Sequence, residues 1–202
     1  MKNIRLDGET VYLRSITNED TPLVVKWRNQ ENVIKYFIYR GEFTEETHTN
    51  WLKTKVETGL VDQFIVCLKD GDVPIGSTYL RDIDTKNSKA EYGVFIGEEG
   101  TRGQGIGKEI LNLTVKYAFE NLKLHKVYAR VIDTNKASLY CFLHSGFFEE
   151  AFFKESVLLD GQYRNVIILS RFNPDEGDGF FENKEYKKEI LGGFRMPMPG
   201  KE

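Results

Sequence analysis

The stretch that decides the fold reads Gly100-Thr101-Arg102-Gly103-Gln104-Gly105-Ile106-Gly107-Lys108-Glu109. It follows a strand-like segment, Lys89–Ile96, and leads into Ile106–Leu122, where apolar residues recur at helical spacing. Glycines allow backbone N–H groups to turn toward a ligand, and the N-terminus of a helix adds partial positive charge. The loop is therefore typical of a phosphate or pyrophosphate site, although a tight strand–helix connection without a ligand can also be rich in glycine.

Three phosphate-binding patterns can be compared with this loop. A P-loop requires glycine at the position of Arg102 and Ser or Thr at the position of Glu109, so that pattern fails. A Rossmann fingerprint requires G-x-G-x-x-G after a first strand, whereas Gly103, Gly105 and Gly107 give G-x-G-x-G late in the chain. The third pattern, R/Q-x-x-G-x-G/A, is matched in full by the six residues from Arg102 to Gly107.

The segments on either side of the loop predict a mixed sheet with flanking helices. Alternating or continuous apolar runs predict strands at 11–16, 63–69, 74–81, 89–96, 126–132, 147–158 and 162–172. Helices are predicted at 44–59, 106–122 and 136–144, and a capping box at 17–20 precedes a further helix through Trp27. Asp70-Gly71 and Asp160-Gly161 are hairpin signals. We therefore expect an α/β (α+β) fold with a mixed, mostly antiparallel sheet, not a doubly wound one.

Two later features complete a resemblance to the GCN5-related N-acetyltransferase (GNAT) family. Asn135-x-x-Ser138 opens the later helix, and Ser145-Gly146-Phe147 leads into the next strand, both at the spacing of that family. The whole stretch from Val11 to Phe172 can be threaded onto the family's order of strands and helices. The chain resembles the branch of ribosomal-protein N-terminal acetyltransferases and nucleotide-amino-sugar N-acetyltransferases.

This resemblance implies that acetyl-CoA is the cosubstrate and that the glycine-rich loop holds its pyrophosphate. Backbone groups at the end of the 89–96 strand, those of Phe95 and Ile96, would bind the acetyl and pantetheine arm of acetyl-CoA. The resemblance assigns to coenzyme A the residues Phe95, Ile96, Arg102, Gly103, Gln104, Gly105, Ile106, Gly107, Lys108, Asn135 and Phe142.

Attack of an amine on a thioester requires a neutral amine, a site for the oxyanion and a proton for the departing thiolate. Glu91 is the candidate general base by resemblance. The alternative, of equal weight, is that Glu91 is an ordinary strand glutamate that faces solvent. Many family members carry a proton-donating tyrosine at the position of Phe142, which has no proton to give. Ser138 shares a helix face with Phe142 and is the candidate for contacting the sulfur, or else it satisfies the helix backbone.

The two early helices carry candidates for binding the acceptor, because in this family such helices form part of the acceptor pocket. A W-R-N sequence here resembles the branch that acetylates the 4-amino group of nucleotide-linked amino sugars. An arginine can bind phosphate, and histidine or tryptophan can hydrogen-bond to or stack on a base. The candidates are Trp27, Arg28, Asn29, His48 and Trp51, and core packing of the two tryptophans and the histidine is the alternative.

Composition excludes several classes of protein. Lys and Arg number 28 against 31 Asp and Glu, a formal charge of −3, which gives no general attraction to nucleic acid or an anionic membrane. Apolar runs fall far short of the roughly 20 residues of a membrane span, and residues 1–5 carry no export signal, so we expect a cytoplasmic protein. The two cysteines, Cys67 and Cys141, have neither CxxC nor paired-histidine spacing, so we expect no metal site.

The sequence predicts an acetyltransferase domain over residues 1–172 and a C-terminal extension over 173–202. The segment Phe180–Phe194 carries an apolar stripe at helical spacing, so we expect a partly helical extension. That stripe would dock on the domain's own sheet or on a second subunit, which would make a homodimer.

These features predict an acetyl-CoA-dependent N-acetyltransferase that acts on the primary amine of a small metabolite, with a nucleotide-linked amino sugar as the specific hypothesis. Acetylation of a protein N-terminus is the alternative within the same class. A non-catalytic acyl-CoA-binding module is the alternative in a different class, because the helix tyrosine is missing.

Overall fold

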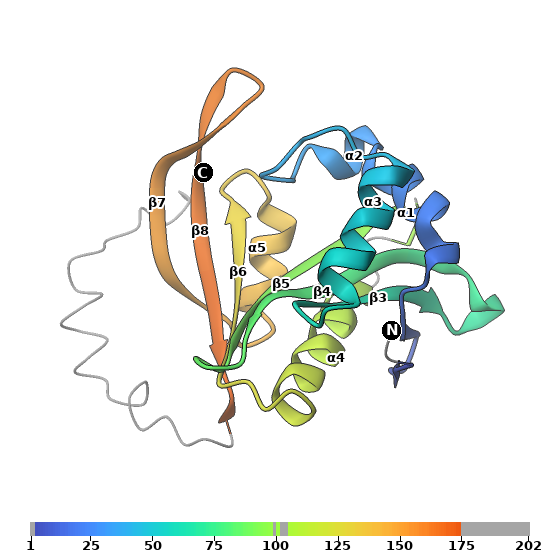
Figure 1. The fold of residues 1–202 in the computed structure, drawn as a ribbon. Coiled ribbons are helices and arrows are strands. Elements are labelled where there is room, and N and C mark those ends of the chain that lie inside the picture. The colour runs from blue at the N-terminus through green and yellow to red at the C-terminus, as the bar shows by residue number, and fades with distance from the viewer. Residues whose placement is uncertain (1–2, 99, 102–104, 175–202) are drawn as a thin grey trace. The chain divides into compact units, whose positions relative to one another are not determined.

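An eight-stranded sheet organises the part of the chain that the structure, a computed structural model, describes: residues 3–98, 100–101 and 105–174 (Figure 1). The strand order is β1-β2-β3-β4-β5-β6-β8-β7. The strands are β1 (Arg5–Asp7), β2 (Val11–Ser15), β3 (Val61–Leu68), β4 (Pro74–Asp84), β5 (Lys89–Ile96), β6 (Lys126–Ile132), β7 (Phe148–Leu159) and β8 (Gln162–Phe172). The ladder between β5 and β6 is parallel, and those of β1–β2, β2–β3, β3–β4, β4–β5 and β7–β8 are antiparallel. The predicted mixed, mostly antiparallel sheet is confirmed.

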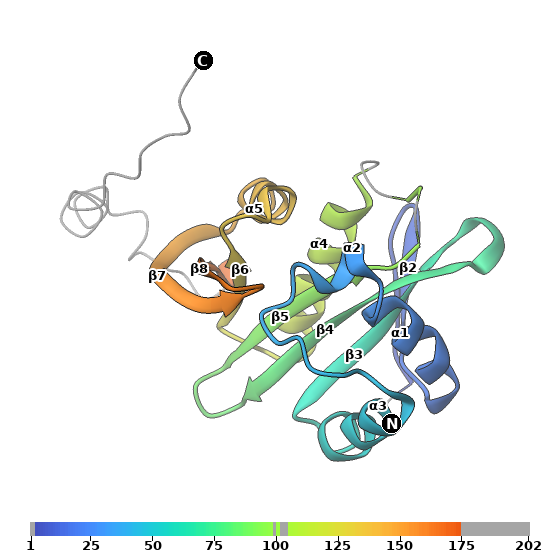
Figure 2. The same cartoon turned by 90° about the horizontal axis from the view of Figure 1, so that it is seen from above.

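Helices cover both faces of this sheet. They are η1 (Asn18–Asp20), α1 (Thr21–Arg28), α2 (Glu31–Ile34), α3 (Glu45–Trp51) with its π-helical continuation η2 (Leu52–Val56), η3 (Asp70–Asp72), α4 (Ile106–Glu120) and α5 (Lys136–Leu143). Seen from above, α1 and α3 lie on one face and α4 and α5 on the other (Figure 2). We call these the α1 face and the α4 face. No described helix is long and apolar enough to cross a membrane.

Strand β3 shows how the sequence produces two cores. Phe64 and Val66 are buried in the core on the α4 face, whereas Ile65 and Cys67 are buried in the core on the α1 face. Successive side chains of a strand point to opposite faces, so a strand covered on both sides is apolar throughout. The continuous apolar run of β3 follows from this double burial.

The parallel ladder between β5 and β6 is short. It joins Lys89–Glu91 to Lys126–Tyr128 and goes no further, although both strands continue. From Tyr92 onward β5 is laddered to β4 on its other side. A third apolar cluster, which includes Ile132 and Ile168, therefore lies beyond the separation of β5 and β6.

The α2–α3 loop (residues 35–44) crosses this separation on the α1 face (Figure 2). Phe37 contacts the ring of Phe95 on β5, with ring centroids 5.9 Å apart. Ile38, the next residue, packs against the cluster on β6 and β8, and Arg40 forms an ion pair with Asp160 in the β7–β8 turn. The loop therefore connects the two parts of the sheet that the short ladder allows to diverge.

Most predicted elements are found with ends shifted by two residues at most, and the larger differences are two elements that were not predicted and two elements whose length differs. The capping box at 17–20 is present, since the carboxylate of Asp20 accepts from the backbone N–H of Thr17 at 2.8 Å. Strand β1 and helix α2 were not predicted, because three- and four-residue elements carry no measurable periodicity. The helix predicted over 44–59 changes to π-helical geometry at Leu52 and ends at Val56, and β4 runs on to Asp84.

The chain divides into two units, Met1–Arg171 and Phe172–Glu202. The sequence predicts the boundary one residue later, after residue 172. All the site residues named above belong to the first unit. The predicted helix over 180–194, and with it the predicted contact with a second subunit, lies outside the described residues.

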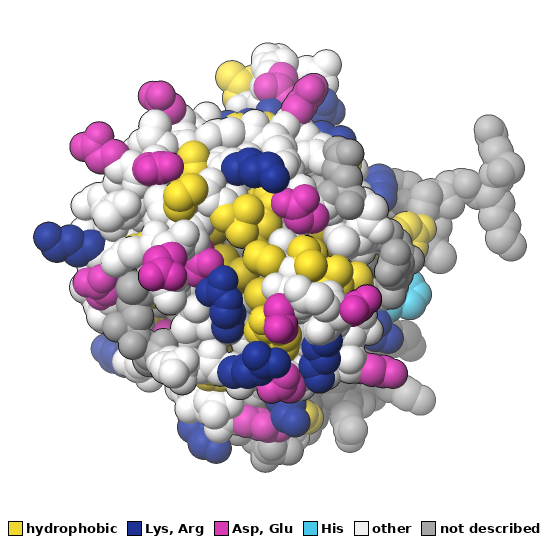
Figure 3. Space-filling view, turned by 90° about the vertical axis from the view of Figure 1, so that its right-hand side faces the viewer, with side chains coloured by type: hydrophobic (Ala, Val, Ile, Leu, Met, Phe, Trp, Pro, Cys, Tyr) yellow, Lys and Arg dark blue, Asp and Glu magenta, His cyan; other side chains and the backbone are white. Residues whose placement is uncertain are grey.

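Charged side chains of both signs are mixed on the surface. Figure 3 views the side that carries α1 and the β3–β4 hairpin, where Lys, Arg, Asp and Glu surround a group of hydrophobic side chains. This intermixing follows from nearly equal numbers of acidic and basic residues and creates no extended field of one sign on this face.

Gly97, directly after β5, has no room for a side chain. A Cβ built there would lie 2.1 Å from Cγ and Cδ1 of Trp27, which is 0% exposed. We expect Gly97→Ala to lower the free energy of unfolding by about 1–3 kcal/mol, because the buried indole cannot move away without disturbing its packing. Chemical denaturation measures the difference.

Gly41→Ala is the matched control, because a Cβ at Gly41 has nothing within 4 Å. We expect it to change the stability by less than about 0.5 kcal/mol. Equal effects of the two substitutions would contradict the close approach of Gly97 and Trp27.

Candidate active site

The candidate site begins where the β5–β6 ladder ends. Glu91 and Tyr128 form its last pair, and the next residues of β5 keep their ladder with β4 alone. Opposite Gly93 on β4 lies Tyr79, and a Cβ at Gly93 would be 2.2 Å from Cζ of that tyrosine. The absence of a side chain at Gly93 therefore lets the Tyr79 ring lie across β5 on the α1 face.

Helix α4 supplies the second part of the site. Gly105 precedes its first residue with φ of +79°, a left-handed conformation that glycine adopts without strain. The first N–H groups of a helix have no intrahelical acceptors, so the start of α4 can bind an anion. Arg102, Gly103 and Gln104 lie outside the described residues.

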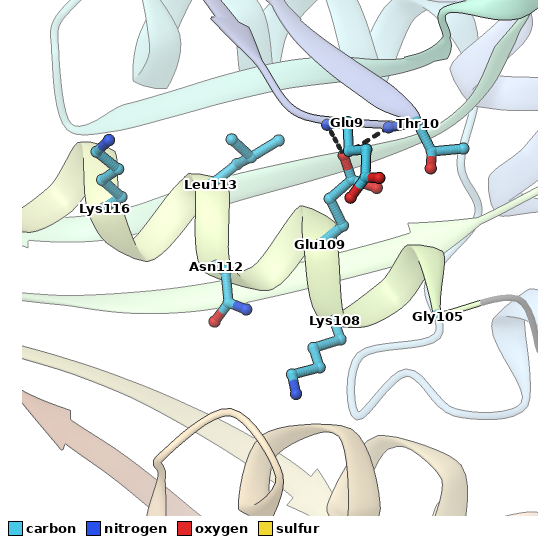
Figure 4. A pocket seen from close by; sticks show the side chains of 8 residues that line it. All are labelled: Glu9, Thr10, Gly105, Lys108, Glu109, Asn112, Leu113 and Lys116. Carbon is cyan, nitrogen blue, oxygen red and sulfur yellow. Dashed lines mark hydrogen bonds between the residues drawn. The ribbon is translucent and has the colours of Figure 1, made fainter.

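A groove of about 450 Å³ runs from Gly105 along α4 toward Lys116 (Figure 4). Glu109 turns toward the β1–β2 turn, where its Oε1 accepts from the backbone N–H of Thr10 at 2.9 Å. Lys108 and Asn112 point away from that turn (Figure 4). The charge of Glu109 is therefore used to hold the β1–β2 turn, while Lys108 remains on the open side of the helix start.

Helix α5 approaches α4 closely. A Cβ at Gly107 would lie 3.7 Å from Sγ of Cys141, an ordinary contact distance. The Oδ1 of Asn135 caps α5 by accepting from the backbone N–H of Ser138 at 3.2 Å. The structure thus brings Asn135 and Ser138 together as a cap, and their contacts with coenzyme A stay predictions.

Phe142 is buried in an aromatic cluster. Its ring meets that of Tyr92 edge-on, with centroids 5.7 Å apart, and that of Phe147 at 4.9 Å. The hydroxyl of Tyr92 is buried in this cluster. Burial raises the pKa of Tyr92, so the phenol stays protonated. A hydroxyl group therefore lies in the cluster around Phe142, from a strand position that sequence reasoning did not select.

Glu91 lies between two arginines. Its carboxylate accepts from Arg81 Nη2 at 2.6 Å and from Arg130 Nε at 3.1 Å, and only 6% of its side chain is exposed. Charge-assisted hydrogen bonds of this kind stabilise an ionised carboxylate. Its role as general base stays a prediction, and the carboxylate would have to leave these partners to reach an amine.

Arg28 is a half-buried cation surrounded by aromatic rings. Its guanidinium carbon lies 3.3 Å from the ring centroid of Phe37, 4.9 Å from that of Phe43 and 5.9 Å from that of Phe95. Burial lowers its pKa to about 10. Within the described residues Arg28 forms no ion pair, and its Nη1 is buried without a hydrogen-bond partner. Arg28 therefore has no opposite charge beside it among the described residues.

The other four residues predicted to contact the acceptor form hydrogen bonds within the protein on the α1 face. Trp27 is fully buried and donates from Nε1 to Glu98 at 2.7 Å. His48 is fully buried, with Nδ1 at 3.0 Å from Thr21 Oγ1.

Trp51 donates from Nε1 to Gln63 Oε1 at 3.0 Å, and Asn29 donates from Nδ2 to the carbonyl of Phe43 at 2.8 Å. For Trp27 and His48, complete burial and hydrogen bonds within the protein favour the core-packing alternative. Contacts of all four with an acceptor stay predictions.

Besides Tyr92, three residues of the candidate site were missed from the sequence: Tyr79, Arg81 and Arg130. The sequence signal that could have indicated two of them is the alternation of side chains along β4, which places Tyr79 and Arg81 on the same face of the sheet. Tyr79 and Arg81 are two apart on β4 and stand opposite Gly93 and Glu91 in the β4–β5 ladder. Selecting them required the strand register, which a single sequence does not provide. No three His, Cys, Asp or Glu side chains in the described ranges are grouped so that they could hold a metal ion.

Comparison with known proteins gives a family match. The model of the acetyltransferase (GNAT) domain matches residues 10–148. A probable N-acetyltransferase, YjcK of Bacillus subtilis, is 25% identical over 178 residues, which are 85% of this chain and 98% of YjcK.

Two further relatives carry names that specify an acceptor. The spermidine N(1)-acetyltransferase of Escherichia coli K12 is 26% identical over 165 residues, 82% of this chain and 87% of its own. The crystal structure of spermidine N-acetyltransferase from Vibrio cholerae in complex with CoA and spermine has a TM-score of 0.77. It is 21% identical and covers 83% of this chain and 98% of its own, so it shows the fold.

The buried His48 makes stability depend on pH. Burial lowers its pKa to about 4, against 6.5 for a free imidazole. Between these values the unfolded chain binds a proton that the folded chain excludes, so stability falls as the pH is lowered from 6.5 toward 4. We expect the free energy of unfolding, relative to that of a His48→Gln variant, to fall by about 3 kcal/mol over this range.

Urea denaturation of both proteins at several pH values measures this difference, and the variant cancels the contributions of other titrating groups. A difference that stays constant from pH 7 to pH 4 would contradict the buried, neutral histidine.

Proposed function

The chain belongs to the GNAT acetyltransferase family and is an acetyl-CoA-dependent N-acetyltransferase, and we propose that its acceptor is the primary amine of a small phosphate-bearing metabolite, specifically a nucleotide-linked amino sugar. The observation that carries this proposal is the half-buried positive charge of Arg28, which has no opposite charge beside it in the described part of the chain. A charged group with reduced access to water and without an opposite charge is destabilising, and an anionic acceptor would supply that charge. Arg28 also lies beside Phe95, at the end of β5 where we place the acetyl group.

The polyamine named in two relatives is the second candidate acceptor, supported by their sequence similarity. Polyamines are cations, so their binding requires carboxylates that are free to interact. On the α1 face, the carboxylate of Glu91 is already shared by two arginines, and Arg28 adds a further positive charge. This electrostatic balance favours an anionic acceptor over a polyamine.

The α2–α3 loop favours a small acceptor over a protein N-terminus, which is the third candidate. A peptide requires an open groove, whereas this loop crosses the α1 face from Phe37 beside Phe95 to Arg40 at Asp160. Tyr39, between them, is within 3.5 Å of Arg130.

In the proposed reaction the amine nitrogen attacks the thioester carbonyl, the new C–N bond forms, and the C–S bond breaks. Backbone groups of Phe95 and Ile96 would orient the acetyl arm, and the start of α4 would hold the pyrophosphate with Gly105–Lys108 and the preceding residues 102–104. The proton lost from the amine leaves to solvent, and the thiolate takes its proton from Ser138 or solvent.

A panel of amines tests the acceptor. With acetyl-CoA and mass-spectrometric detection, we expect kcat/KM for a nucleoside-diphosphate-linked 4-amino sugar to exceed that for spermidine or a free peptide N-terminus by at least about tenfold. Arg28→Met should raise KM for the sugar nucleotide by about tenfold or more, because the phosphate loses its cation.

Lys26→Met is the control, because Lys26 is an exposed cation on the same helix. It should leave KM within about threefold of the parent value. A preference for spermidine, unchanged by Arg28→Met, would overturn the proposed acceptor.

The pyrophosphate site has a separate test. Gly105→Asp would place a negative charge and a strained backbone at the start of α4, because φ there is +79°. We expect calorimetry to show at least about tenfold weaker binding of coenzyme A. Gly161→Asp is the control, since Gly161 also has positive φ and lies in the β7–β8 turn. Equal coenzyme A affinity in a folded Gly105→Asp variant would refute the assignment of this loop.

A further inference from the structure

Two arginines and one glutamate form a cluster on the α1 face, at the point where β5 and β6 begin to separate. Arg81 on β4 stands opposite Glu91 on β5, and its Nη2 lies 2.6 Å from Glu91 Oε1. Arg130 on β6 reaches the other carboxylate oxygen, with Nη2 3.0 Å from Oε2 and Nε 3.1 Å from both oxygens. One carboxylate therefore holds a guanidinium group from each neighbouring strand.

Within the cluster two guanidinium groups share the buried carboxylate of Glu91, and the only other carboxylate paired with them in the described part of the chain is that of Asp82, which is largely exposed. The carboxylate is on the inside, with 6% of the Glu91 side chain exposed, against 21% for Arg81 and 27% for Arg130. The Nε of Arg81 is buried without a hydrogen-bond partner in the described part of the chain, and its distance to Asp82 Oδ2 is 4.0 Å. The two guanidinium groups are therefore the more accessible part of the cluster, and one donor of Arg81 makes no hydrogen bond within the described residues.

We propose that Arg81 and Arg130, held in position by Glu91, bind a phosphate group of the acceptor. This inference rests on the proposed function, because it concerns the same acceptor. A guanidinium group presents several N–H donors in one plane and can bind two phosphate oxygens at once. Two such groups would repel each other if Glu91 did not lie between them, so Glu91 is a positioning residue for the pair.

The location of the cluster suits an acceptor whose amine and phosphate are separated. Glu91 precedes Phe95 by four residues of the same strand, a distance of about 13 Å at the usual rise of a strand. Arg28 lies beside Phe95, and burial together with the nearby charge of Arg81 lowers the pKa of Arg28. Arg28 and Arg81 are thus near enough for the two phosphates of a nucleoside diphosphate to be shared between Arg28 and the cluster. A nucleotide-linked sugar has its amine and its phosphates on different carbon atoms of a ring, so the two ends can be bound at different positions along β5.

This role differs from that of a general base in its kinetic consequence. A base acts on every amine, so its loss lowers kcat for all acceptors and changes the pH dependence of the rate. A positioning residue for a phosphate site changes KM, and only for acceptors that carry the phosphate. The charged and titratable groups around Glu91 are Tyr79, Arg81 and Asp82 on β4, Tyr128 and Arg130 on β6, and Tyr39 of the α2–α3 loop.

Steady-state kinetics with a matched pair of acceptors test the inference. The pair is a nucleoside-diphosphate-linked 4-amino sugar and the same 4-amino sugar without phosphate, each assayed with the full chain and acetyl-CoA. We expect Arg130→Gln and Arg81→Gln to raise KM for the phosphate-bearing acceptor at least about tenfold, and KM for the free sugar by less than about threefold.

Glu91→Gln should raise KM for the phosphate-bearing acceptor in the same way and leave the shape of the pH–rate profile unchanged. Glu91→Asp keeps the negative charge and should restore part of the lost affinity. Arg5→Gln is the charge control, because Arg5 is an exposed arginine at the β1 edge of the sheet. Melting temperature and coenzyme A affinity verify that each variant is folded, and Arg130→Gln decides the question if Glu91→Gln does not fold.

The outcomes separate the inference from the proposed function. If the parent protein acetylates neither sugar, the proposed function fails, and the inference fails with it. If the parent acetylates the phosphate-bearing sugar and the arginine variants raise KM equally for both acceptors, the inference alone is overturned. A Glu91→Gln variant with reduced kcat for both acceptors and an altered acid limb of the pH profile would identify Glu91 as the base instead.

Discussion

The short parallel ladder between β5 and β6 is the constraint on which the rest of the site depends. Once the ladder ends at Glu91, the main chain of β5 keeps its partner β4 on one side and faces a diverging strand on the other. Backbone groups that lack a partner in the sheet must be satisfied by another molecule or by water. In the proposed function, this sheet geometry provides the position at which the extended, amide-containing arm of acetyl-CoA would bind.

The same divergence explains the distribution of charge on the α1 face. Side chains at the last ladder pair are close enough to interact across three strands, and this is where Arg81, Glu91 and Arg130 meet. Further along β5 the described ladder with β6 does not continue. Aromatic rings from the α2–α3 loop and α1 fill the space there, and Arg28 lies among them. Charge pairing and aromatic packing thus occupy successive positions along one strand.

Sequence reasoning identified the elements with strong periodicity or turn chemistry. The bounds of β5, β6 and β8 were predicted correctly, because each is an apolar run bounded by turns. The Asp-Gly pairs at 70–71 and 160–161 also predict turns. In the structure both glycines have positive φ, as such turns require.

Other features could not be obtained from the sequence alone. The burial of His48 depends on the packing of α3 against α1, and a helical histidine next to a tryptophan is equally consistent with a core and with a pocket. The arginines of the cluster come from strands separated by more than forty residues in sequence. Only the register of β4, β5 and β6 shows that they share Glu91.

The α2–α3 loop has a consequence for how this protein can change. Its far end is held by three consecutive residues, Ile38 in an apolar cluster, Tyr39 beside Arg130, and Arg40 paired with Asp160. None of these contacts belongs to a strand ladder of the sheet. Insertions or substitutions in residues 35–44 can therefore alter the surroundings of the proposed acceptor site while β5 and the start of α4 keep their geometry. Acceptor preference can evolve in this loop independently of the use of acetyl-CoA.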